Sequence, residues 1–280
     1  MTWLTDHKIP IGKILEDFVD FLNDYFFWFF DAITLGMGYV LEGMAHLLLA
    51  ANPFLLIGAV AAVAYFIHRS WKLVMFVVPS LLFIINQGYW EDTIFTLSLV
   101  TWATAVCLTI GIPVGIAAAH RPKVWAVLRP VLDMMQTLPT FVYLIPALVL
   151  FGLGMVPGLI ATAIFAVAAP IRMTYLGISS VPVPLIEAAE SFGATKRQLL
   201  WKVEIPHALP TIMAGLTQCI MLSLSMVVIA SMVGADGLGI PVLRAINTVN
   251  TAKGFEAGIA IVIVAILMDR ICKRPERADR

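Results

Sequence analysis

Charged residues are scarce in this sequence of 280 residues, in which Asp, Glu, Lys and Arg together make up 13%. A soluble domain of average composition is about one quarter charged, so the polar surface expected of such a domain is missing here. Hydrophobic residues make up 60%, and the mean hydropathy is +0.93. A lipid bilayer explains both values, because it replaces water around the protein. Lys plus Arg and Asp plus Glu both number 18, so no excess of positive charge indicates nucleic-acid binding.

Cysteine clusters, nucleotide loops and a secretory leader are also lacking. Cys107, Cys219 and Cys272 are far apart and lie mostly in apolar runs, which predicts small buried side chains rather than metal ligands. No Gly-x4-Gly-Lys-Ser/Thr loop is present, so the chain is not expected to bind ATP by that route. The segment Met1–Asp24 is acidic and has no early apolar core, which argues against a cleavable signal peptide. We therefore expect no metal and no cofactor in this chain.

Long uncharged runs predict an all-α integral membrane protein, a helical bundle of about seven spans. Residues 93–119, 134–171 and 208–235 carry no formal charge. Each run exceeds the roughly 20 residues that cross a ~30 Å hydrocarbon core. Glycines and a proline in Phe151–Gly158 divide the second run into two spans joined by a tight turn. Three further spans are predicted at Pro53–Ile67, Leu73–Ile85 and Ala252–Met268.

Basic residues occur in alternate loops, and this pattern predicts the orientation of the spans. The loop His68–Lys72 is basic, Gly88–Asp92 is acidic, and the loops that follow His120 and Arg172 are basic again. Loops rich in Lys and Arg stay in the cytoplasm, so the basic C-terminal tail is predicted to be cytoplasmic and the acidic N-terminus external. The loop Asp236–Lys253 dissents, because it carries two basic residues on the predicted outer side.

The N-terminal segment has a helical apolar pattern that is interrupted by acidic residues. Met37, Leu41, Met44 and Leu48 recur at helical spacing, opposite Glu42 and His46. With the aromatic run Tyr25–Phe30, this pattern predicts an amphipathic helix that lies in the outer interface. An additional full span is the alternative. The predicted divisions are residues 1–52 for this segment, 53–88 for two spans, 89–271 for a core and 272–280 for the tail.

The predicted cytoplasmic loop Val181–Pro206 begins with signals for a short helix. Pro184 suits the first helical position, because its missing N–H has no partner there. Glu187 and Glu190 come early in the helix, where the helix dipole favours negative charge. Gly193 can adopt the left-handed conformation that ends a helix.

A second short helix is predicted directly after this glycine. Thr195 with Gln198 three residues later forms a capping-box pattern, and Pro206 is expected to stop the helix. The predicted hairpin therefore has one apolar face toward the membrane helices and one face of small residues that another protein can approach closely. The apolar face is Leu199, Leu200 and Val203; the small face is Ala188, Ala189, Gly193 and Ala194.

This loop resembles the EAA loop of binding-protein-dependent ABC importer permeases. Glu187-Ala-Ala, then Gly193, then Val203-Glu-Ile-Pro206 have that family's spacing, and only Val203 and Ile205 depart from its usual residues. The resemblance implies a type I ABC importer permease fold and a homodimer in the bacterial inner membrane, in contact with membrane lipid. It also implies an extracytoplasmic binding protein and a separate ATPase subunit that binds ATP and Mg²⁺. The implied coupling residues are Glu187, Ala188, Ala189, Gly193, Ala194 and Pro206.

The resemblance covers roughly residues 89–270 and points to one branch of the family. Met135–Pro146, Pro170–Thr174 and Ser225–Gly239 are similar to the glycine betaine, proline and choline permeases. Asp236, with the segments Arg244–Asn250 and Trp3–Pro10, looks more like the choline permease than the osmoprotectant permeases. The implied solute is therefore choline, with glycine betaine or proline betaine as the alternative.

Polar and aromatic residues inside the predicted spans are candidates for a gate or pathway, because such groups are costly in lipid. Arg172 can snorkel, pair with a carboxylate, or act as a gate. Gln218, Thr101 and Thr104 can form hydrogen bonds between helices or line the pathway. Trp102 and Tyr143 could contact a quaternary ammonium through their rings, although aromatic residues in a bilayer mostly serve packing. Pro113, Pro139, Pro146 and Pro170 are expected to kink spans.

Two other classes of membrane protein are disfavoured. An ion-driven secondary transporter typically shows internal repeats, and neither a repeat nor paired carboxylates at mid-span is found here. A membrane-embedded enzyme is disfavoured because the 5 histidines have no ligand spacing.

Overall fold

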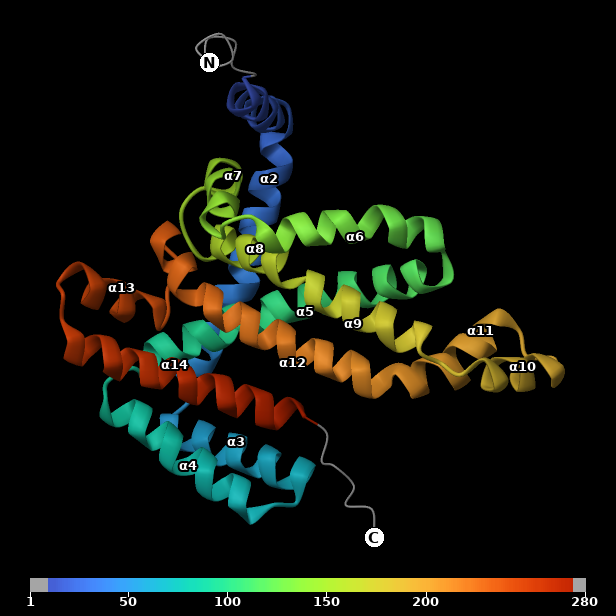
Figure 1. Ribbon diagram of the computed structural model, residues 1–280. Coiled ribbons are helices and arrows are strands. Elements are labelled where there is room, and N and C mark those ends of the chain that lie inside the picture. The colour runs from blue at the N-terminus through green and yellow to red at the C-terminus, as the bar shows by residue number, and fades with distance from the viewer. Residues whose placement is uncertain (1–9, 274–280) are drawn as a thin grey trace.

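The computed structural model describes residues 10–273, and every regular element in that range is helical (Figure 1). The choline-like opening Trp3–Pro10 and the basic tail therefore lie almost entirely outside the described residues. The peripheral helices are α2 (Ile11–Ala50), α3 (Pro53–His68), α4 (Trp71–Asn86), α6 (Pro122–Thr137), α7 (Phe141–Phe151), α13 (Gly239–Asn247) and α14 (Thr251–Cys272). The central helices are α5 (Trp90–His120), α8 (Met155–Ala166), α9 (Ala168–Ser179) and α12 (Ile205–Ala230).

The core of the bundle is formed by α5 and α12 with α8 and α9, which follow one another in the stretch Met155–Ser179; α5, α9 and α12 run beside one another in Figure 1. Small residues allow this close packing. A Cβ on Gly115 of α5 would lie 2.6 Å from the Cβ of Thr174 of α9, and one on Gly215 of α12 would lie 2.8 Å from the Cβ of Met173. Cys107 and Cys219 are buried in this core, as predicted, whereas Cys272 is only half-buried. Helices in lipid associate through such close backbone contact.

The described chain contains four helical stretches that are long and apolar enough to cross a membrane: Gly12–Ala50, Trp90–His120, Met155–Ser179 and Lys196–Val233. The pair α6 and α7 makes a fifth if counted as one broken span. Helices α3 and α4 have 16 residues each, which at 1.5 Å per residue gives about 24 Å, short of a full ~30 Å crossing. The prediction of a helical membrane bundle is confirmed, with four or five spans of sufficient length rather than about seven.

The first predicted span of the 134–171 run is not one helix. Helices α6 and α7 meet at an angle of 96°, and the break is at Leu138, whose ψ of 135° is extended. Leu138 precedes Pro139, and the proline ring pushes the residue before it out of the helical region. Pro113 and Pro146, in contrast, lie inside α5 and α7. The turn predicted at Phe151–Gly158 is present in a shorter form, between the end of α7 and the start of α8.

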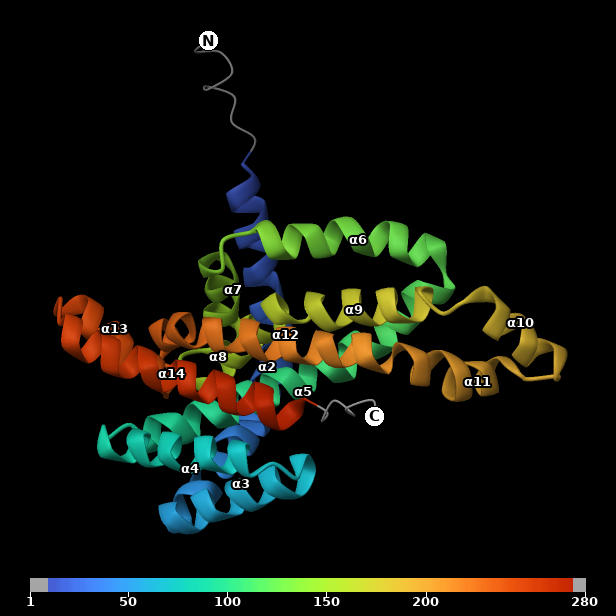
Figure 2. The same cartoon turned by 60° about the horizontal axis from the view of Figure 1, so that its bottom comes forward.

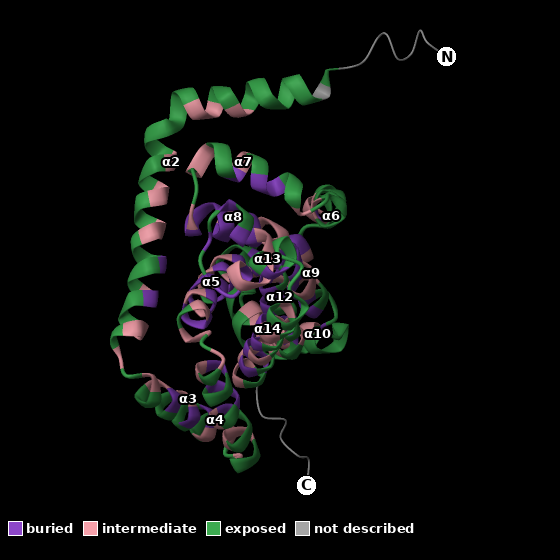
Figure 3. Ribbon diagram, turned by 90° about the vertical axis from the view of Figure 1, so that its left-hand side faces the viewer, coloured by how far each residue is buried: buried purple, intermediate pink, exposed green. Residues whose placement is uncertain are grey.

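Helix α2 bends at Phe26, whose φ of −120° and ψ of 17° are not helical. Figure 3 shows the part after the bend along the side of the bundle and the part before it turned across its end. Leu41 is buried and its carbonyl accepts a hydrogen bond from Ser98 of α5 at 2.7 Å, whereas Glu42 and His46 are exposed. The predicted apolar stripe therefore faces the bundle. The interfacial position stays a prediction, and the alternative of a full span meets the requirements of length and composition.

Helices α3 and α4 form a hairpin that packs beside α14 (Figure 2). Ile57, Val77 and Ile84 of the hairpin are buried in one cluster with Val264 and Leu267 of α14. The N–H at Nε2 of His68 donates to the carbonyl of Ile271 at 3.3 Å. This contact holds the turn between α3 and α4 against the C-terminal end of α14.

Candidate functional site

The predicted coupling loop is a helical hairpin at one end of the bundle, where α10 (Val183–Ser191) and α11 (Lys196–Leu199) project beyond α9 and α12 (Figure 1). Helix α10 begins at Val183, one residue before the predicted first position at Pro184. It ends as predicted, because Gly193 has a φ of +77°. The Gly193 N–H donates to Glu190 at 2.8 Å, and the Ala194 N–H donates to Ala189 at 3.1 Å. These bonds satisfy carbonyls at the helix end.

The predicted capping box at the start of α11 is confirmed. The Gln198 N–H donates to Oγ1 of Thr195 at 3.3 Å, and the Thr195 N–H donates to Oε1 of Gln198 at 2.8 Å. Both ends of the short link Gly193–Thr195 are therefore fixed by local hydrogen bonds. The orientation of α10 relative to α11 follows from that link.

The predicted stop at Pro206 is wrong. Helix α11 continues through a π-helical turn at Leu200–Glu204 directly into α12, so the helical stretch runs from Lys196 to Val233. A proline in an α-helix clashes with the carbonyl four residues earlier and lacks an N–H. The wider π turn just before Pro206 relieves that conflict, since its carbonyls bond to N–H groups one residue further on. The hairpin is thus joined to a membrane span through continuous helix.

The outer surface of the hairpin exposes apolar and small side chains. Phe192 is 93% exposed and Trp201 is 61% exposed, and no residue of α10 is buried. A Cβ on Gly193 would meet nothing within 4 Å, so the small face is open. The predicted apolar face is half-buried, and Leu200 packs toward the bundle. Large exposed aromatic side chains are of the kind that anchor contacts between proteins.

Arg172 has a carboxylate partner. Its Nη2 donates to Oδ1 of Asp133 at 2.7 Å, which connects α9 to α6. Both side chains are partly exposed, at 33% and 53%. Of the three roles considered from the sequence, the structure provides the ion pair.

The other pathway candidates lie in different surroundings. Gln218 of α12 and Thr101 of α5 are exposed, whereas Thr104 is buried. Trp102 is half-buried against the main core. Tyr143 of α7 is buried, and its hydroxyl donates to the carbonyl of Met135. No cage of aromatic faces is formed by these two residues, because Tyr143 packs in a separate cluster with Leu144 and Met226.

Two features of the site were not anticipated from the sequence. One is an exposed stripe along α12 and the 3-10 turn that follows it (Ser231–Val233), made up of Ala214, Gln218, Met221 and Ser225 of α12 and Met232 of the turn. The spacing of four, three, four and seven residues would have been visible as a polar and methionine face in an otherwise apolar span. The other is an ion pair between His120 of α5 and Glu204, the last residue of the π turn. The two residues are 84 positions apart, so no local pattern in the sequence indicates that they pair.

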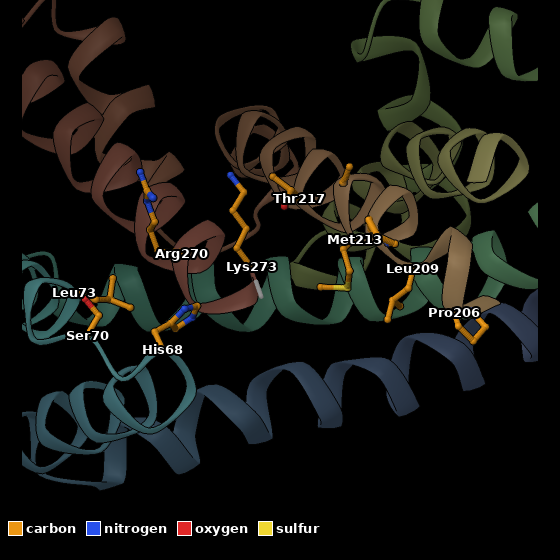
Figure 4. Close-up of a pocket in the computed structure, with 11 residues that line it drawn as sticks. His68, Ser70, Leu73, Pro206, Leu209, Met213, Thr217, Arg270 and Lys273 are labelled. Atoms are coloured by element: carbon orange, nitrogen blue, oxygen red, sulfur yellow. The ribbon is translucent and has the colours of Figure 1, made fainter. Parts of the chain in front are cut away.

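A cavity of about 760 Å³ lies between the first turns of α12, the end of α14 and the α3–α4 turn (Figure 4). Its wall on α12 runs from Pro206 to Thr217, and Arg270, Lys273 and His68 line the opposite side. Lys273 is paired with Asp269 at 2.8 Å. Within residues 10–273, no group of three or more His, Cys, Asp or Glu side chains is placed to hold a metal ion.

Comparison with known proteins adds family information to this geometry. Residues 111–275 match the family described as "Binding-protein-dependent transport system inner membrane component". The glycine betaine transport system permease protein OpuAB of Bacillus subtilis is 46% identical over 264 residues, covering 94% of this chain and 93% of the relative. A crystal structure of the MetNI methionine ABC transporter in inward-facing conformations aligns with a TM-score of 0.57, covering 68% of this chain and 93% of that chain. At 23% identity, that likeness shows the fold alone.

The choline branch is more distant. The choline transport system permease protein OpuBD of Bacillus subtilis is 33% identical over 170 residues, covering 60% of this chain and 75% of the relative. The predicted preference for choline is therefore not confirmed, and the alternative of a glycine betaine permease fits better. Asp236 and the segment Arg244–Asn250 had favoured the choline permease, but the chain as a whole is more similar to the glycine betaine permease.

Proposed function

Because the chain belongs to the family of binding-protein-dependent transport system inner membrane components, we propose that its solute is glycine betaine or a closely related quaternary amine. The chain is a membrane-embedded transport subunit of an importer and not an enzyme. It has the type I ABC importer permease fold. The observation that carries the proposed solute is the 46% identity with a glycine betaine permease over nearly the whole chain.

The hairpin from α10 to the π turn is the proposed docking site for an ATPase subunit. Its exposed Phe192 and Trp201 are large apolar groups of the kind that dominate binding at protein interfaces. The open small face, Glu187 to Ala189 with Gly193 and Ala194, lets a groove of the ATPase approach the backbone. ATP and Mg²⁺ are bound by that subunit, and Pro206 at the base of α12 transmits its movement.

The hairpin end of the bundle is the proposed cytoplasmic side. The start of α6, the hairpin and the end of α14 lie toward this end in Figure 1, and they carry Lys123, Lys196, Arg197 and Arg270. The positive-inside rule then places this end in the cytoplasm of the bacterial inner membrane, with the C-terminus. The opposite end faces the extracytoplasmic binding protein.

Two copies of the chain are proposed to pair along the exposed stripe of α12. Gln218 would be costly in contact with lipid tails, and a facing second copy or a pathway removes that cost. Gln218 and Thr101 are the proposed pathway residues. Trp102 and Tyr143 are proposed to stabilise packing, because Tyr143 is buried and Trp102 is half-buried against the main core. Solute selection is then left mainly to the binding protein.

The proposed solute is tested by transport. The chain is reconstituted in liposomes with its ATPase and binding protein, and uptake of labelled glycine betaine is measured with and without an equal concentration of unlabelled choline. We expect ATP-dependent uptake that choline reduces only slightly. An ATPase subunit with its P-loop lysine replaced serves as the control. Preferred uptake of choline would overturn the solute assignment.

A further inference from the structure

Glu204 is a buried carboxylate at the junction between the coupling hairpin and the bundle. Its side chain is only 6% exposed, and it is the last residue of the π turn that joins α11 to α12. The adjacent packing is apolar, because Leu200 and Ile205, together with Ile116 and Ala119 of α5, pack against a buried cluster of Ile178 of α9 with Ala208 and Ile212 of α12. A carboxylate in such surroundings is costly unless it is paired and hydrogen-bonded.

His120 is the partner of this carboxylate, and it is the last residue of α5. Its Nε2 lies 2.9 Å from Oε2 and 3.1 Å from Oε1 of Glu204, so both oxygens face the imidazole N–H. The imidazole is 44% exposed and lies at the C-terminal end of α5. The ion pair therefore connects the end of α5 to the base of the hairpin.

The two flanks of this junction differ. On the side of α5 and α9, the base of α12 is held by the contact between His120 and Glu204 and by the apolar cluster against which Leu200 and Ile205 pack. On the other side, the same turns of α12 border the 760 Å³ cavity that begins at Pro206 (Figure 4). The π turn itself is an irregular point in the helix, and such turns often lie at functional sites. The junction is thus tied to α5 and has open space toward α14.

We propose that His120 and Glu204 are positioning residues for ATP-coupled transport, which tie the coupling hairpin to α5 so that a movement of the hairpin displaces α5 and α12 together. This inference rests on the proposed docking of an ATPase on the hairpin. Without the ion pair, the π turn absorbs the movement and the hairpin shifts alone. ATP hydrolysis then continues while transport falls.

The test uses the complete transporter in liposomes, with uptake and ATP hydrolysis measured on the same samples. In His120→Ala and Glu204→Ala we expect uptake per ATP hydrolysed to fall about tenfold, the size of effect typical of lost coupling between sites. Glu204→Gln, which keeps a hydrogen-bond acceptor, is expected to lose less.

The exchanged pair His120→Glu with Glu204→His is expected to recover most of the ratio. His207→Ala is the matched control, because this exposed histidine lies three residues after Glu204 and has no role in the site.

Backbone amide exchange over Leu200–Ile205 gives a second measurement that needs no solute. We expect these amides to exchange about tenfold faster in both alanine variants and to be unchanged in His207→Ala. In one outcome, liposomes that contain the wild-type transporter fail to take up glycine betaine although the alanine variants still differ in exchange. That result would show that the proposed solute is wrong and would support the tie to α5. Unchanged exchange in both variants, unchanged uptake per ATP, or an exchanged pair that does not recover the ratio would each overturn the inference.

Discussion

The coupling hairpin and the set of candidate pathway residues present opposite cases. In the hairpin, positions Gly193, Thr195 and Gln198 adopt the local conformations that their chemistry predicts. Among the pathway candidates, similar polar residues take unrelated positions: Arg172 pairs with Asp133, whereas Gln218 is exposed on α12. The hairpin is governed by hydrogen bonds between residues a few positions apart. The surroundings of each candidate pathway residue depend on which helix lies opposite to it. Lipid or a second copy of the chain also contributes to those surroundings.

The largest effect is expected from Gly193→Val. A φ of +77° is costly for a residue with a Cβ, by about 1–2 kcal/mol, and more for a β-branched side chain. No neighbour is close enough to be hit, so the cost is purely one of backbone conformation. We expect ATP-dependent uptake to be lost while the chain still inserts, as measured by uptake and by immunoblot of membranes. Gly193→Asn, which tolerates this conformation, should keep most uptake. Normal uptake by the valine variant would argue against a rigid hairpin.

A smaller effect is expected from Phe192→Ser. This side chain is 93% exposed and adds nothing to packing within the chain, so its loss should leave folding intact. A buried aromatic anchor at an interface is typically worth about 2 kcal/mol or more, which corresponds to roughly thirtyfold in affinity. We expect weaker binding of the ATPase subunit, measured with fluorescently labelled ATPase and the chain in nanodiscs. Leu153→Ser, at a 77% exposed position in the turn between α7 and α8, is the control and should bind normally. Equal affinities of the two variants would place the docking site elsewhere.

The smallest effect is expected from Arg172→Gln. An ion pair with this much exposure is worth about 0–1 kcal/mol, so uptake should change by no more than about fivefold. Asp133→Asn should have the same effect, and the double variant should be no worse than either single variant. Uptake rates at several solute concentrations provide the measurement. A much larger loss in Arg172→Gln than in Asp133→Asn would restore the interpretation of Arg172 as a gate.

Sequence reasoning was most successful where a structural feature depends on neighbours along the chain. The helical end at Gly193, the capping box at Thr195 and the apolar stripe of α2 are present as predicted. It failed at two prolines, in opposite senses. Pro139 breaks a predicted span by 96°, whereas Pro206 does not stop a helix, because a π turn accommodates it. A proline makes an uninterrupted α-helix costly, but packing decides whether the chain turns or widens locally.

Residue composition and long uncharged runs by themselves determined the membrane class, the loop's resemblance to the EAA loop indicated the family, and local signals determined the helix end at Gly193 and the capping box at Thr195. These properties depend on the numbers of charged and hydrophobic residues or on spacings of a few residues. Both can be read directly from the sequence. Only the tertiary structure decided that α2 packs on the bundle, that Arg172 pairs with Asp133 and that His120 meets Glu204. These contacts join residues 39 to 84 positions apart, and their formation depends on how close-packed helices are arranged. A buried carboxylate such as Glu204 reveals its partner only when the elements around it are in place.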